Sequence, residues 1–275
     1  MAILDGKIKK TTNFKQVVDS IVARMFSVQV DTKRIYVDLN SCVSVLFRYD
    51  DVNNPEVSKM VSDNIERFLL RYLETKTEII ILFTLEKSQA HTDIFPDWCK
   101  ERYDRVNITK SGFLRALILS LSEFSKKNSL VKIANVHKVH PALIVYKNEL
   151  NRRTKFTVLS KDVVFQCITN KNMIVYTGVD IIDMEDEPRQ LPDDISLTDP
   201  DTMLPYYLAI KGDIRNEFPG VEGYAKRKAA KYCETNRIAI KVGANHPLKE
   251  EVDKWVQLYN ISKLLENNKE EIRLI

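Results

Sequence analysis

Short, continuous apolar runs alternate along this chain with longer segments whose apolar residues recur at helical spacing. The apolar runs cover residues 78–83, 154–159 and 173–176, and a β-rich run over 34–41 meets an aspartate and then turns. Continuous apolar character predicts strands that are buried on both faces of a sheet. Helical spacing is found over residues 14–25, 55–72, 114–124 and 252–265. Strands that alternate with helices predict an α/β fold with a mostly parallel sheet.

Composition limits the class of protein. The chain has 275 residues, of which 44% are hydrophobic, so it can bury the core of one large domain, or of one domain with a small satellite. No run approaches the roughly 20 apolar residues that a membrane span needs, and residues 1–12 lack the apolar region of a signal peptide. The cysteines form no CxxC pair, which favours buried structural thiols in a reducing, cytoplasmic compartment over a zinc site or disulfides. They are Cys42, Cys99, Cys167 and Cys233.

The charge pattern changes abruptly in the last third of the chain. Residues 180–201 carry nine acids against one base, whereas residues 211–241 carry eight bases against four acids. Such blocks predict a solvated acidic loop followed by a solvated basic face. The net charge of +4 is too small to imply nucleic acid by itself, so the basic block is the more informative feature.

Three of the seven glycines, Gly212, Gly220 and Gly223, fall within twelve residues. Glycine at 220 and 223 permits the positive φ angles of a tight hairpin. A helix that follows the hairpin would present free backbone N–H groups and a basic first turn, and both bind phosphate oxygens without reading sequence. The bases are Lys226, Arg227, Lys228 and Lys231. The alternative is an ordinary interhelical turn that leads into a solvated basic helix.

The glycine-rich segment resembles the G-D-x-x-D-N-I-P-G-V-x-G motif of the flap-endonuclease superfamily. It reads Gly212-Asp213 and then Pro219-Gly220-Val221-Glu222-Gly223. Other landmarks of the family follow in the expected order. They are a first strand ending in a metal-binding aspartate (35–41), the strand that runs into V-F-D-G (80–83), the basic stretch leading into the arch (95–102) and the S-x-D-x-D-F strand end (158–165). The likeness spans roughly residues 34–235 and is nearest to the phage ribonuclease H and 5′-exonuclease branch.

The resemblance implies a fold and a partner. The implied fold is a PIN-like α/β domain over 1–200, with a mostly parallel sheet flanked by helices, followed by a helical region over 201–275 that carries a helix–three-turn–helix motif. In the family this motif grips duplex DNA, so the implied partner is DNA that is branched or has a 5′ single strand. The hairpin glycines and the four bases would bind it, together with Lys100 and Arg102 of the arch, where Trp98 could stack on bases.

The resemblance also implies metal ions, because the family cuts phosphodiesters with two divalent cations held by carboxylates. Asp38, Asp162 and Asp213 occupy metal-binding positions of the family pattern. Other acidic positions of that pattern hold neutral residues: Leu85, Val164, Asn216 and the whole of 138–145. Three carboxylates would hold at most one weakly bound Mg²⁺ or Mn²⁺ ion.

Three functions follow from this pattern. The first is a pseudonuclease, which keeps the fold and the DNA grip without two-metal catalysis and acts as a binding or assembly subunit, with protein partners in a viral replication or transcription complex. The second is a divergent, active 5′ nuclease in which Glu86 or an acid from 180–201 replaces a lost ligand. The third is a structural or protein-interaction component. His137 and His140 could also form a metal pair, although packing or surface roles are more ordinary for such a spacing.

Overall fold

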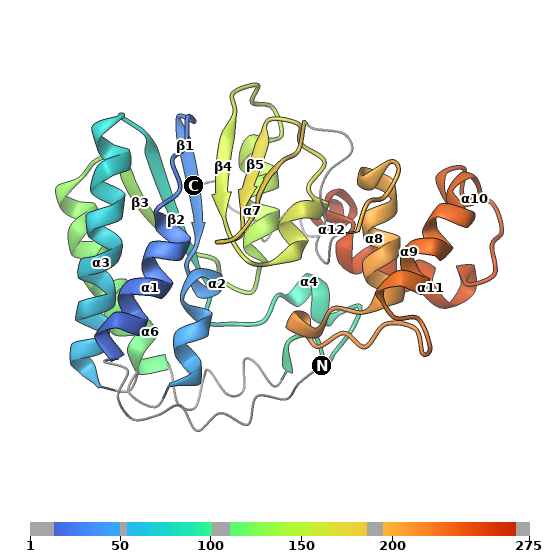
Figure 1. The fold of residues 1–275 in the computed structure, drawn as a ribbon, viewed down its shortest axis with the longest axis horizontal. Helices are drawn as coiled ribbons and strands as arrows, with labels where there is room; N and C mark the ends of the chain where they lie inside the picture. The colour runs from blue at the N-terminus through green and yellow to red at the C-terminus, as the bar shows by residue number, and fades with distance from the viewer. Residues whose placement is uncertain (1–13, 50–53, 101–110, 186–194, 268–275) are drawn as a thin grey trace.

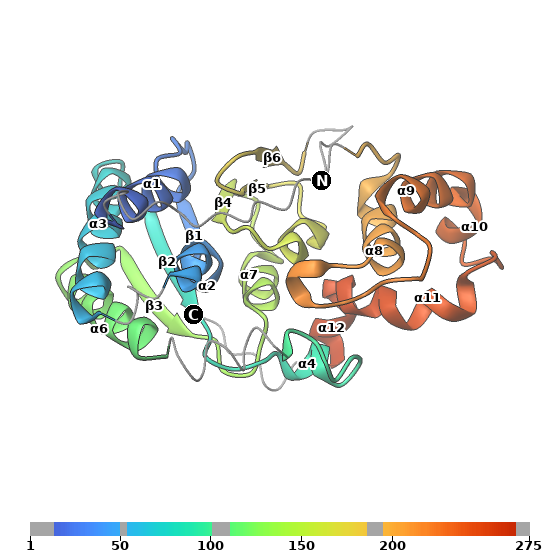
Figure 2. The same cartoon turned by 60° about the horizontal axis from the view of Figure 1, so that its bottom comes forward.

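The computed structural model describes residues 14–49, 54–100, 111–185 and 195–267. Its six strands form one sheet in the order β3-β2-β1-β4-β5-β6 (Figures 1 and 2, with β6 labelled in Figure 2). The first five pair in parallel, and only β6 runs antiparallel to its neighbour β5. The strands are β1 (Arg34–Asp38), β2 (Glu78–Phe83), β3 (Val131–Asn135), β4 (Phe156–Leu159), β5 (Met173–Tyr176) and β6 (Ile181–Asp183). The predicted mostly parallel α/β sheet is therefore confirmed.

Helices cover both faces of the sheet. One face packs against α1, α3 and α6, and the other packs against α7, beyond which the same apolar core continues into the C-terminal helices (Figures 1 and 2). Alternate residues of one strand serve the two faces, since Ile79 and Ile81 belong to the first apolar core and Ile80 and Leu82 to the second. The helices are α1 (Phe14–Phe26), α2 (Leu39–Val43), α3 (Pro55–Glu74), α4 (Gln89–Thr92), α6 (Ser111–Lys127) and α7 (Pro141–Glu149).

The C-terminal part of the chain is helical and shares the second core. It comprises α8 (Pro200–Lys211), α9 (Lys226–Thr235), α10 (Arg237–Lys241), α11 (Lys249–Val256) and α12 (Ile261–Asn267) (Figure 2). Tyr207 and Tyr259 are fully buried in the same apolar cluster as Val158 and Phe165. All four cysteines are buried and free, as predicted. Among the described residues, no helix is long and apolar enough to cross a membrane.

Several elements differ from the sequence predictions. The helix expected over 252–265 is interrupted, because α11 ends at Val256 and a 3₁₀ turn, η6 (Gln257–Tyr259), follows it. Asn260 then starts α12 by accepting a hydrogen bond from the Lys263 N–H (3.2 Å). The stretch 180–201, predicted as a loop, contains β6, whose Ile182 is buried against the sheet, and the start of α8. Strand β3 and helix α7 were not predicted at all.

Candidate functional site at the carboxyl ends of the strands

The order of strands in the sheet changes direction at β1: β2 and β3 are added on one side of it, and β4 and the strands after it on the other. In parallel sheets, a crevice for ligands forms at such a switch point, beyond the carboxyl ends of the strands. Asp38 ends β1, and Asp162 follows β4 by three residues. The fold therefore brings two of the three predicted metal-binding aspartates to the switch point from positions far apart in the sequence.

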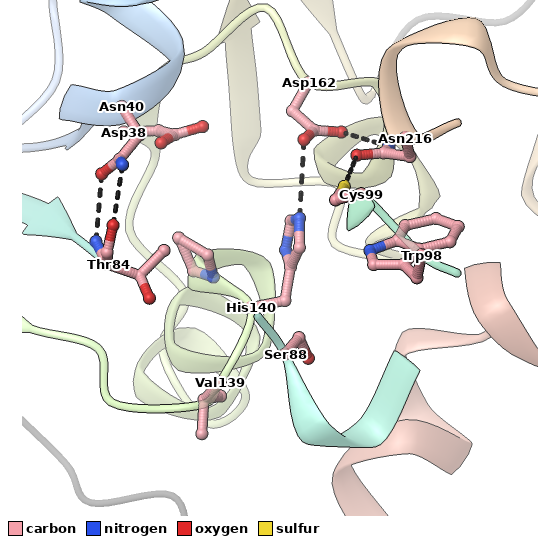
Figure 3. A pocket seen from close by; sticks show the side chains of 11 residues that line it. Asp38, Asn40, Thr84, Ser88, Trp98, Cys99, Val139, His140, Asp162 and Asn216 are labelled. Carbon is pink, nitrogen blue, oxygen red and sulfur yellow. Dashed lines mark hydrogen bonds and ion pairs between the residues drawn. The ribbon is translucent and has the colours of Figure 1, made fainter. Parts of the chain in front are cut away.

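Asp38 is held by the elements on either side of it. It caps α2 by accepting a hydrogen bond from the Ser41 N–H (3.3 Å), and its Oδ2 accepts a hydrogen bond from the Ser160 hydroxyl (2.8 Å). The neighbouring Asn40 exchanges two hydrogen bonds with the backbone of Thr84, at the end of β2 (2.7 and 3.0 Å; Figure 3). Asp38 is thus held between the ends of β1 and β4, and the neighbouring Asn40 joins the same segment to the end of β2.

Asp162 lies opposite an imidazole. His140 caps α7, with its Nδ1 accepting a hydrogen bond from the Ala142 N–H (3.1 Å). In the neutral ring this assigns the proton to Nε2, and Nε2 lies 3.5 Å from Oδ2 of Asp162 (Figure 3). The other carboxylate oxygen, Oδ1, accepts hydrogen bonds from the Val164 N–H (3.1 Å) and the Asn216 amide (3.4 Å).

The third aspartate reaches the site from the C-terminal region. Asp213 begins a short turn, η5 (Ile214–Asn216), which an antiparallel bridge to Phe218 closes. The Asn216 amide donates a hydrogen bond to Asp213 Oδ2 (2.7 Å) as well as to Asp162, so it links the two carboxylates. The guanidinium of Arg215 donates from Nη2 to the Ser41 hydroxyl (2.7 Å), and its Nε lies 4.0 Å from Asp162 Oδ2.

A cavity of about 20 Å³ lies between these groups. Asp38, Asn40, Asp162, His140 and Asn216 line it, as Figure 3 shows. A space of this size holds about one water molecule. Two of the three carboxylates, those of Asp38 and Asp162, therefore border a small, nearly filled space that Asp213 does not line.

Burial dominates the electrostatics of the site. It raises the pKa of Asp38, and the charge of Asp162 raises it further, while the charge of Arg215 and the Ser160 hydrogen bond act in the opposite direction. Burial and the charge of Asp162 likewise raise the pKa of Asp213. Desolvation lowers the pKa of the fully buried His91, next to His140, to about 3, so that ring is neutral at pH 7. The site keeps more carboxyl groups than cations.

Replacing Asp38 by asparagine tests this charge balance through pH. Because the pKa of Asp38 is raised by folding, the folded state binds more protons than the unfolded chain, and stability falls as pH rises through the folded pKa. We expect D38N to gain stability relative to the parent protein as pH rises from 5 to 7.5, because only the parent protein must ionise this buried carboxyl group. Urea unfolding at the two pH values measures it. The exposed Asp63 on α3 provides the control D63N, and a difference that is constant or falls with pH would contradict the prediction.

The donor set does not fit the two-metal centre that the resemblance implies. Each of the three carboxylates already accepts hydrogen bonds from protein side chains or N–H groups, and a guanidinium points into the cluster. Val164 and Asn216 supply no charge where the family pattern has acids. Within the described part of the chain, no group of three His, Cys, Asp or Glu side chains is arranged to hold a metal ion.

The substitute ligands considered from the sequence are engaged elsewhere. Glu86 pairs with His137 (3.0 Å), whereas His140 faces Asp162, so the two histidines do not form a metal pair. In the acidic stretch, Asp183 and Glu185 both pair with Lys155. Asp199 pairs with Lys241 (2.7 Å). Among the described residues these acids therefore pair with bases outside the aspartate cluster, and Asp186, Glu187, Asp193 and Asp194 lie outside the described residues.

The predicted hairpin is present between α8 and α9. Gly212, Gly220 and Gly223 all have positive φ angles, at 85°, 73° and 77°. A Cβ atom on Gly220 would lie 2.3 Å from the Gly212 nitrogen, so the two strands of the hairpin touch at these glycines. Helix α9 begins at Lys226, and no side chain caps its first turn. Four exposed bases lie on it: Lys226, Arg227, Lys228 and Lys231.

The structure describes two of the three residues predicted to contact DNA from the arch. Lys100 is exposed and pairs with Asp97 (3.1 Å), and Arg102 lies outside the described residues. Trp98, predicted as a base-stacking residue, is 1% exposed and stacks on His91 with ring centroids 4.7 Å apart. That prediction was wrong, because the indole fills the core beside the site rather than facing solvent.

Sequence reasoning missed most of the groups that surround the aspartates. Arg215 and Ser160 were not singled out, and His140 was considered as a metal ligand or as a packing or surface residue, but not as a partner of Asp162. The signals were present, since Arg215 stands beside the Asn216 substitution and His140 precedes Pro141, as a helix cap does. What the sequence does not show is that Arg215 meets Ser41, 174 residues away.

No protein-family model and no curated protein sequence matches this chain. Three solved structures from bacteriophage T5 do match its fold. The flap endonuclease, in a pseudo-enzyme–product complex with DNA and metal ions, has a TM-score of 0.53 at 16% identity, over 86% of both chains. The D15 protein co-crystallised with metal ions gives 0.54 at 15%, over 86% of both chains, and the 5′-exonuclease with bound zinc gives 0.51 at 16%, over 85% of this chain and 86% of that one. The chain therefore has the flap-endonuclease fold that its motifs predict.

Proposed function

We propose that this protein binds nucleic acid through a flap-endonuclease fold and does not perform two-metal hydrolysis. One observation carries the proposal: Asp162 faces the Arg215 guanidinium (4.0 Å) and the His140 imidazole (3.5 Å), and the Asn216 amide donates hydrogen bonds to both Asp162 and Asp213. Two-metal cleavage requires carboxylates that are free to coordinate both ions. Here a guanidinium, an imidazole and an amide all face Asp162, while Asp38 accepts hydrogen bonds from Ser41 and Ser160.

The basic surface of α9 supports the binding half of the proposal. Exposed bases over a helix N-terminus bind phosphates irrespective of base sequence. Lys228 lies over the ring of Tyr224 (4.2 Å), which holds this cation beside the hairpin. The T5 structure in complex with DNA supports DNA as the ligand. We assign the grip to residues 201–275 and the nuclease-type sheet to residues 1–200, with Lys100 as a further contact.

The competing function is a divergent, active 5′ nuclease that uses Asp38, Asp162 and Asp213 with one Mg²⁺ or Mn²⁺ ion. Its support is the fold, which it shares with metal-bound nucleases. In a third function, the protein would be a structural component that has kept the fold but does not bind DNA. Cleavage and binding measured on the same sample separate the three.

The test is incubation of the purified full chain with a 5′-labelled flap duplex, first in Mg²⁺ and then in Mn²⁺. We expect a gel shift without cleavage in either metal. Cleavage that disappears in D162A would instead establish an active nuclease, and the absence of both signals would favour the structural component. D63N serves as the control for D162A, because it removes an exposed acid on α3, away from the site.

A further inference from the structure

Arg215 connects the hairpin to the sheet. It lies in η5, at the tip of the turn between α8 and α9, and its side chain is 25% exposed. Its guanidinium reaches Ser41 in α2, whose hydroxyl also accepts a hydrogen bond from the Lys161 N–H after β4 (2.7 Å). One side chain of the C-terminal region thus contacts the ends of both strands at the switch point.

The adjacent Asn216 strengthens the same junction. Its amide donates to Asp162 and Asp213, its side-chain oxygen accepts a hydrogen bond from the Cys99 thiol (3.1 Å), and its backbone carbonyl accepts one from the Cys99 N–H (3.1 Å; Figure 3). The family pattern has an aspartate at this position. An aspartate would remove the amide donor and add a fourth carboxyl group to a buried cluster.

The three aspartates need a cation. Asp38, Asp162 and Asp213 are 4–5% exposed, and carboxylates buried together are unfavourable unless a positive charge or protonation relieves them. Arg215 and His140 supply the favourable electrostatic interactions with Asp38, and Arg215 is the larger of the two. Arg215 is therefore the main positive charge that acts on Asp38, whereas Lys211 is the one that acts on Asp213.

We propose that the Arg215 guanidinium is the resident cation of the carboxylate site and docks the hairpin on the sheet without a divalent metal. Arginine suits this position because its planar fork binds several oxygens at once and stays charged at all relevant pH values. Arg215 is a positioning residue: it holds the turn that leads into α9. The inference concerns the folded chain alone, so it can fail or hold independently of whether the protein binds DNA.

Thermal unfolding of the full chain in EDTA, and then in MgCl₂ or MnCl₂ at matched ionic strength, tests the proposal. For the parent protein we expect midpoints that agree within about 1 °C, since a ligand that does not bind the folded state does not shift its stability. R215A should melt roughly 5 °C lower or more in EDTA, because it leaves buried carboxylates unpaired. Mn²⁺ should restore much of this loss by binding the vacated carboxylates. If Arg215 had a purely structural role, R215A would have a lower unfolding midpoint that Mn²⁺ does not restore.

Two further variants keep the test decisive if R215A does not fold. R215K retains the charge, so it should melt between the parent and R215A and show no metal response. N216D adds a carboxyl group between Asp162 and Asp213, so it should gain stability from Mn²⁺ that the parent lacks. R67A, at an exposed arginine on α3, is the matched control. A saturable stabilisation of the parent protein by Mn²⁺ that is abolished in D162N would overturn the proposal. So would R215A and N216D variants whose unfolding midpoints equal that of the parent protein and do not change with Mn²⁺.

Discussion

Replacing Lys226, Arg227 and Lys228 by alanine should weaken the binding of duplex DNA roughly 100-fold at low salt, for every DNA sequence tested. The three bases are exposed in the first turn of α9, where no side chain caps the helix N–H groups. Each phosphate that a base neutralises releases counterions, so the slope of log affinity against log salt should fall by up to about 3. Fluorescence anisotropy of a labelled duplex, titrated at several salt concentrations, measures both quantities.

The matched control removes three exposed lysines from the other end of the molecule. Lys59 on α3 and Lys126 and Lys127 at the end of α6 have no part in the proposed grip, and their replacement changes the net charge by the same amount. The control should lose little affinity and keep the salt slope. Equal losses in both triple variants would show that net charge, rather than the α9 surface, drives binding, and an unchanged slope in the α9 variant would exclude the grip.

The interior strands of the sheet could be predicted from the sequence, whereas its two edge strands could not. Strand β2 is buried on both faces and reads as an uninterrupted apolar run. Strand β3, at one edge, mixes buried Val131 with exposed Lys132, so its sequence has no clear period. Strand β6, at the other edge, has three residues within an acidic stretch. Edge strands have few neighbours to impose a pattern, which is why both were missed.

The site could be predicted only in its acidic part. Asp38, Asp162 and Asp213 stand in motifs whose order along the chain is informative, and the first two end or follow predicted strands. Their partners depend on tertiary contact: His140 and Arg215 meet Asp162 across separate elements. The sequence alone does not show that Asp162 would face the guanidinium of Arg215, because this contact depends on how the hairpin packs against the sheet.

Gly220→Ala should lower the free energy of unfolding by about 2–5 kcal/mol, from backbone strain of about 1–2 and overpacking of about 1–3 kcal/mol. Gly220 has a φ of 73°, and a Cβ there would lie 2.3 Å from the Gly212 nitrogen and 2.6 Å from the Ile210 carbonyl oxygen. Neither atom can retreat easily, since the same Ile210 carbonyl accepts a hydrogen bond from the Val221 N–H (2.8 Å). Guanidinium unfolding of the full chain measures the loss.

Gly223→Ala separates the steric cost from the strain. Gly223 has a similar φ of 77°, but the nearest atom to a Cβ added at this position is the flexible Lys228 Nζ, at 3.9 Å. This variant should therefore lose only the strain, about 1–2 kcal/mol. Equal losses in the two variants would mean that the contact between Gly212 and Gly220 does not hold the hairpin closed. A larger loss at Gly220 would show that the close approach of the two backbones, rather than positive φ alone, is what requires glycine before α9.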